Sequence, residues 1–140
     1  MKIIECPRDA IQGIENFIPT EKKIKYLNSI LNLGFDTIDF GSFVSAKAIP
    51  QLRDTAEVLA GLDLNEGSSK LLAIIANLRG ATDACHFEEI NYLGFPFSIS
   101  ETFQQRNTHS SIAESLVNLT AIQNLASKNK LFLCFFFFFN

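Results

Sequence analysis

The chain has 140 residues, of which 47% are hydrophobic and 19% are charged, and its net charge is −3 at pH 7. These values are typical of one globular domain, and the absence of a basic run argues against nucleic acid as a partner. Its three cysteines are widely spaced and form no CxxC pair, which favours reduced thiols in a cytoplasmic protein.

The first predicted element is a short buried strand, Ile3–Glu5, which ends at Pro7 because proline cannot continue a central ladder. Arg8 and Asp9 follow it side by side. At the end of a strand, a carboxylate can hold a metal ion and a guanidinium can hold an oxyanion. In a loop, such a pair is usually a solvated ion pair that contributes little. Taken alone, Arg8 and Asp9 are better explained as a solvated ion pair. We expect a loop over Asp9–Pro19.

Strand and helix patterns then alternate through four β–α units, which predicts parallel strands with right-handed crossovers. Polar connections are expected at Gly61–Ser69 and Gln104–Ser110. The elements between residues 20 and 127 are a helix from Thr20 to a stop at Gly34, a strand Phe35–Phe40, a helix beginning at Pro50, a strand Leu71–Ala76, a helix Ala81–Tyr92, a strand Phe95–Ile99 and a helix Ser111–Ser127.

The last predicted element is a fifth strand, Leu131–Phe139, with the unusual sequence LFLCFFFFF. Barrel strands normally mix β-branched and small side chains so that their layers fit together, and five consecutive phenylalanines do not. We expect either a truncated reading frame or a genuine, very hydrophobic terminal strand. Nine apolar residues are too few to span a bilayer as a helix, and the N-terminal sequence lacks the apolar core of a signal peptide. No membrane partner is therefore expected.

Three stretches together resemble hydroxymethylglutaryl-CoA lyase: Ile3–Gly13 (IIECPRDAIQG), Thr37–Ser45 (TIDFGSFVS) and Pro50–Leu59 (PQLRDTAEVL). The resemblance implies an α/β fold, the N-terminal half of a TIM barrel with about four β–α units and an anomalous fifth strand. A complete barrel needs about 250 residues, so only half can fit here. We divide the chain into a partial lyase domain, residues 1–130, and an anomalous Phe-rich tail, residues 131–140.

The resemblance implies catalytic roles for Arg8, which would stabilise an enolate, and Asp39, which would orient that arginine. Asp39 stands where better-known lyases of the family carry glutamate, so its reach is one methylene shorter. Asp9 would be a ligand of a divalent metal, Mg²⁺ or Mn²⁺. Three further residues match substrate-binding positions: Gln12, Ser42 and Asn107. Each also has a simpler explanation, namely a solvated side chain for Gln12, a cap for Ser42 and a turn for Asn107.

The reaction implied by the resemblance is metal-dependent retro-Claisen cleavage of 3-hydroxy-3-methylglutaryl-CoA to acetoacetate and acetyl-CoA. The partner would be an acyl-CoA substrate, and the full-length relative would form a homo-oligomer. The family's remaining metal ligands and its proton-transfer cysteine belong to the missing half, so this chain is expected to be an inactive fragment. Two alternatives remain open: a fragment of another acyl-CoA or pyruvate carboxyltransferase-type barrel enzyme, and a non-catalytic half-barrel.

Overall fold

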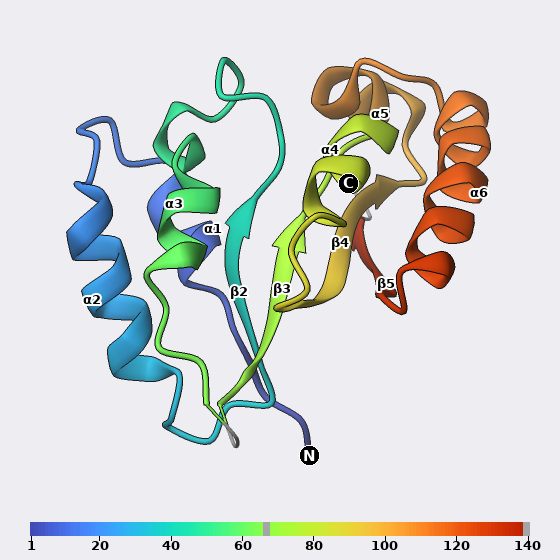
Figure 1. The fold of residues 1–140 in the computed structure, drawn as a ribbon. Coiled ribbons are helices and arrows are strands. Elements are labelled where there is room, and N and C mark those ends of the chain that lie inside the picture. Colours follow the sequence, from blue (N-terminus) through green and yellow to red (C-terminus); the bar gives the residue numbers. More distant parts are fainter. Residues whose placement is uncertain (66–67, 139–140) are drawn as a thin grey trace.

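The computed structural model describes residues 1–65 and 68–138, and for Asn107 it describes the backbone alone. Its strands form one parallel sheet in the order β1–β2–β3–β4–β5, flanked by helices (Figure 1). The strands are β1 (Ile4–Glu5), β2 (Thr37–Ser42), β3 (Lys70–Ile74), β4 (Ile90–Ser98) and β5 (Phe132–Phe138). The predicted parallel α/β architecture is confirmed.

Helices connect successive strands, as the alternation predicted. They are α1 (Pro7–Gln12), α2 (Thr20–Ile30), the 3₁₀ turn η1 (Pro50–Leu52), α3 (Thr55–Ala60), α4 (Leu78–Ala84), α5 (Glu101–Thr108) and α6 (Ile112–Lys128). In Figure 1, α2 and α3 lie beside β1 and β2, and α6 lies beside β4 and β5. Alternate residues of the strands meet these helices in one core, which contains Ile38, Phe40, Leu71, Ala73, Leu93, Phe95, Leu27 and Ile122.

Two predicted helices are found where the apolar spacing placed them. The α2 helix begins at Thr20 but ends at Ile30, ahead of Gly34, which takes a left-handed φ of 89° in the loop that follows. The α6 helix begins after Ser111, which forms a capping box with Glu114. The side chain of each of these residues accepts a hydrogen bond from the backbone N–H of the other. This local signal explains why the start of α6 was predictable.

Near the N-terminus, two expectations were wrong. Residues 7–12 form helix α1 and not a loop, because Pro7 at the first helical position is already set for helical φ. Ile3 and Ile4 are about half exposed and not buried, because β1 is an edge strand paired only with β2 among the described strands. Helix α1 turns Arg8 into the structure directly after this strand, whereas Asp9 stays exposed.

Several other boundaries also differ from expectation. The helix predicted over Ala81–Tyr92 is the shorter α4, which begins after Asn77, whose side chain accepts the Gly80 N–H. Residues 90–92 instead open β4, in which Ile90 and Tyr92 pair with β3. The polar stretch predicted as a loop after β4 is helix α5, capped by Ser100. Strand β2 extends through Ser42, and the helix expected from Pro50 is divided into η1 and α3.

The Phe-rich tail forms strand β5 as predicted, and every residue from Phe132 to Phe138 pairs with β4. Phe139 and Asn140 lie outside the described residues. Gly94 leaves room for the tail, since a Cβ at this position would stand 2.8 Å from Cε2 of Phe136. The outer edge of β5 has no strand beside it among the described residues, and Phe132 and Phe137 are more than half exposed there.

Candidate active site

A buried ion pair joins α1 to β2. The Arg8 Nη2 donates to Asp39 Oδ2 at 2.7 Å, and its Nε donates to Oδ2 at 3.0 Å and to Oδ1 at 3.2 Å. The Arg8 side chain is 10% exposed and that of Asp39 is fully buried. Parallel strands place their C-terminal ends at one edge of the sheet, so the two residues converge as predicted. Aspartate reaches the arginine despite being shorter than glutamate.

The other terminal nitrogen of Arg8 binds two neighbours on its own helix. Nη1 donates to Gln12 Oε1 at 2.7 Å and to Asp9 Oδ1 at 3.2 Å. Among the described residues, these contacts and those to Asp39 occupy four of the five guanidinium N–H groups and leave one on Nη2. The guanidinium is therefore held in one orientation and retains a donor for another oxygen.

Asp39 faces away from the helix-covered core. Its neighbours Ile38 and Phe40 belong to that core, and side chains alternate along a strand. In the sheet register, Asp39 lies beside Leu72, which is also fully buried. Burial raises the pKa of the Asp39 carboxyl above its ordinary value, against the lowering effect of the Arg8 hydrogen bonds. Arg8 therefore favours the charged carboxylate, and burial opposes it.

Asp9 supplies one carboxylate that could bind a metal ion, and its side chain is 65% exposed. Within residues 1–65 and 68–138, no group of three or more His, Cys, Asp or Glu side chains could hold a metal ion. The Asp39 carboxylate is already used by Arg8. The described residues therefore do not form a metal site by themselves, and the role of Asp9 as a ligand stays a prediction.

The structure gives a different outcome for each of the three predicted substrate-binding residues. Gln12 contacts Arg8 directly, as described above. Ser42 is buried, and its hydroxyl donates to the Ile74 carbonyl and accepts the Val44 N–H, so it caps the end of β2. The side chain of Asn107 lies outside the described residues. Substrate binding by these three residues stays a prediction.

The cysteines do not form activated thiols. Burial raises the pKa of the Cys6, Cys85 and Cys134 thiols, and for Cys6 the nearby Asp39 carboxylate adds to this effect. All three are free. They are therefore protonated at neutral pH, which agrees with the prediction of reduced thiols.

Sequence reasoning missed a second buried ion pair beside the site. Lys23 Nζ donates to Asp54 Oδ1 at 2.7 Å, and both side chains are less than 10% exposed. A signal was available, because Lys23 shares a helix face with Leu27 and Ile30, and a lysine on an apolar face needs a buried partner. This pair anchors α2 to the start of α3.

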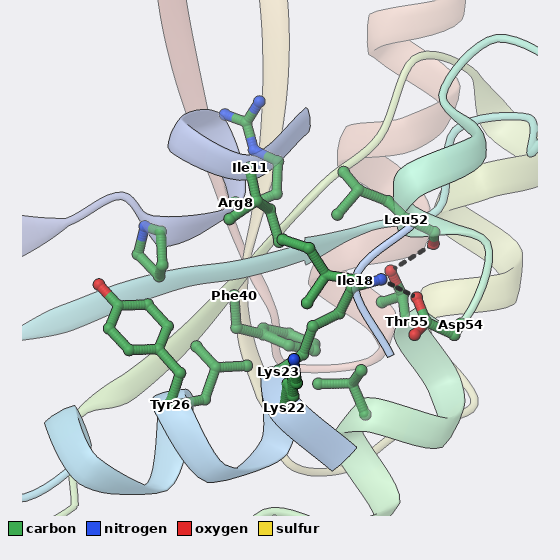
Figure 2. Close-up of a pocket in the computed structure, with 13 residues that line it drawn as sticks. Arg8, Ile11, Ile18, Lys22, Lys23, Tyr26, Phe40, Leu52, Asp54 and Thr55 are labelled. Carbon is green, nitrogen blue, oxygen red and sulfur yellow. Dashed lines mark hydrogen bonds and ion pairs between the residues drawn. The ribbon is translucent and has the colours of Figure 1, made fainter. Parts of the chain in front are cut away.

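A cavity of about 140 Å³ lies between α1, α2, β2 and α3 (Figure 2). Phe40, Leu52 and Val58 line it, together with the stem of Arg8. Figure 2 shows the Arg8 guanidinium pointing away from this cavity. The guanidinium of Arg8 therefore lies outside the cavity, on the side where Asp39 lies.

Comparison with known proteins confirms the resemblance to hydroxymethylglutaryl-CoA lyases. The chain is 37% identical over 125 residues to the enzyme of Bacillus subtilis, covering 89% of this chain and 41% of the relative. The solved structure of a Bacillus subtilis lyase matches with a TM-score of 0.89 and 34% identity, over 97% of this chain and 45% of that one. No family model matches the chain.

A lyase from Acinetobacter baumannii, solved in complex with coenzyme A and 3-methylmalate, matches with a TM-score of 0.87 and 34% identity, over 94% of this chain and 43% of that one. The chain spans about two fifths of the length of the curated relatives it matches. The predicted fold, the N-terminal half of a TIM barrel, is confirmed. Among the described residues, no helix is both long and apolar enough to cross a membrane.

Proposed function

We propose that this half-barrel supplies the arginine side of a hydroxymethylglutaryl-CoA lyase active site, which a complete barrel uses to cleave 3-hydroxy-3-methylglutaryl-CoA. The observation that carries the proposal is the Arg8 guanidinium, held by buried Asp39 with one N–H left over. An arginine fixed in this way can stabilise an oxygen that becomes negative during a reaction without first reorganising.

The proposed reaction needs such an oxygen. Loss of the substrate hydroxyl proton to a base allows the adjacent carbon–carbon bond to break, and this releases acetoacetate. The electron pair of that bond becomes the enolate of acetyl-CoA, and protonation of the enolate carbon gives acetyl-CoA. Arg8 would bind the enolate oxygen, and the base and the acid would come from parts of a barrel beyond this half.

The neighbours of Arg8 would have supporting roles. Asp39 would hold the guanidinium plane through its paired hydrogen bonds. Asp9 would be one ligand of Mg²⁺ or Mn²⁺ in a complete barrel that adds the others, and Gln12 would contact substrate from its place beside Arg8. Three free cysteines suit a reducing compartment, and we propose the cytoplasm.

A chimeric barrel tests this proposal. Residues 1–130 would be joined to the remaining C-terminal part of the Bacillus subtilis lyase, and acetyl-CoA release would be followed with added Mn²⁺. Arg8→Lys keeps the charge but loses the planar fork, so we expect kcat to fall about 100-fold or more. Arg79→Lys, an exposed arginine on α4, should leave kcat unchanged. Equal effects of the two changes would refute the role of Arg8.

A further inference from the structure

Gln51 holds the loop that follows α1 from within the protein. Its side-chain Nε2 donates to the carbonyls of Ile14 and Asn16 at 2.8 and 3.0 Å, and its Oε1 accepts the Ile18 N–H at 2.8 Å. Gln51 is 4% exposed. One buried amide therefore satisfies three backbone groups of a loop that has no other regular structure.

Gln51 is itself held in place. The buried Lys23 Nζ donates to the Gln51 carbonyl, and Asp54 balances the lysine charge. Thr20 Oγ1 also donates to Asp54, at 2.9 Å. The same Lys23 lies over the Phe17 ring, with 4.2 Å from Nζ to the ring centroid. The loop is thus held by the hydrogen bonds of Gln51 to its backbone and by the contact of Lys23 with the Phe17 ring.

This loop is the direct continuation of α1. Gln12, the last residue of α1, accepts a 2.7 Å hydrogen bond from Arg8, and the residues that Gln51 binds begin two positions later. We infer that Gln51 is a positioning residue that keeps the Arg8 guanidinium on Asp39 by fixing the C-terminal end of α1. The inference rests on the proposed function for its catalytic meaning, but the geometry can be tested without turnover.

The test measures hydrogen exchange at the Arg8 Nε–H by NMR, in the 140-residue chain fused to a small solubility-enhancing domain. Gln51→Leu removes all three hydrogen bonds, and Gln51→Glu keeps only the acceptor for Ile18. We expect Arg8 Nε–H exchange to accelerate about tenfold or more in Gln51→Leu and by an intermediate factor in Gln51→Glu. The matched control is Gln104→Leu, because Gln104 is 1% exposed and its amide also makes three hydrogen bonds, to Ser98, Thr108 and Ser115.

Faster exchange at Arg8 in the Gln51 variants alone supports the inference. Unchanged Arg8 exchange with faster Ile18 amide exchange would show that Gln51 holds the loop without positioning the arginine, and would overturn it. An equal acceleration in Gln104→Leu would also overturn it, because the effect would then be global. None of these outcomes depends on lyase activity, so a failure of the proposed function remains distinguishable.

Discussion

The Arg8 guanidinium binds the Asp39 carboxylate through three hydrogen bonds of 2.7 to 3.2 Å, although 31 residues separate the two positions. The pair joins the first two β–α units of the sheet, and it is buried on the side of β2 opposite the helix-covered core. A buried pair of this kind is costly to break, because removing one partner leaves the other without compensation.

Arg8→Met should therefore destabilise the fold at neutral pH by about 3 to 5 kcal/mol, since the buried Asp39 carboxyl loses all three hydrogen bonds from its partner. Urea denaturation followed by circular dichroism measures the loss. Arg79→Met is the control, because Arg79 is exposed on α4 and should change stability by less than about 0.5 kcal/mol. Similar losses in both variants would show that the Arg8 pair does not stabilise the fold.

The raised pKa of Asp39 predicts how stability changes with pH. A carboxyl whose pKa is higher in the folded state than in the unfolded state favours folding when protonated. The stability of the wild type minus that of Asp39→Asn should therefore be largest below about pH 3.9 and should decrease as pH rises through the folded-state pKa. Urea titrations of both proteins from pH 3 to pH 7 measure this difference. A difference that grows with pH would show that Arg8 lowers the pKa of Asp39 by more than burial raises it.

These contacts also show which features a sequence can reveal. Arg8 and Asp39 could be predicted to converge because Arg8 follows the first of two successive parallel strands and Asp39 lies in the second. The start of α6 could be predicted because Ser111 and Glu114 cap it locally. Gln51 could not be recognised, since its three partners lie 33 to 37 residues away and are backbone atoms without a side-chain pattern.

The error over α5 has the same physical origin. Its residues read as a polar loop, but Gln104 is buried, and its amide contacts lie on β4 and α6 as well as on α5 itself. The polar side chains predicted a solvent-exposed loop, whereas the fold supplies Gln104 with buried hydrogen-bond partners. At α4 the error was one of boundary, because residues 90–92 belong to β4, whereas the sequence analysis assigned them to the preceding helix.

Gly94→Ala tests whether the Phe-rich tail is a packed strand. The added Cβ would stand 2.6 Å from Ile74 Cδ1 and 2.8 Å from Phe136 Cε2, so we expect a loss of about 1 to 3 kcal/mol in urea denaturation. Gly13→Ala is the control, with no atom within 4 Å of its Cβ. Adding Phe136→Leu to Gly94→Ala should recover part of the loss. No recovery would indicate that Phe136 does not pack over Gly94.

The open edge of β5 should make the isolated chain self-associate. Phe135 and Phe137 are 43% and 54% exposed on β5, which has no strand on its outer side among the described residues, and such an edge is a template for intermolecular pairing. Phe135→Lys with Phe137→Lys should reduce the association seen by sedimentation velocity. Leu33→Lys, which changes a residue 67% exposed before β2, is the control and should have no such effect. A monomeric wild type at micromolar concentration would contradict this expectation.

The most direct test of the central claim, that this chain carries one half of a lyase site, is acetyl-CoA release from 3-hydroxy-3-methylglutaryl-CoA with added Mn²⁺. The assay compares the 140-residue chain with the chimeric barrel described above. We predict turnover by the chimera and none by the chain alone, because Asp9 is its one proposed metal ligand and a single exposed carboxylate binds Mn²⁺ weakly. Metal-dependent turnover by the 140-residue chain, abolished by Asp9→Ala, would contradict the account and indicate that two copies complete the site.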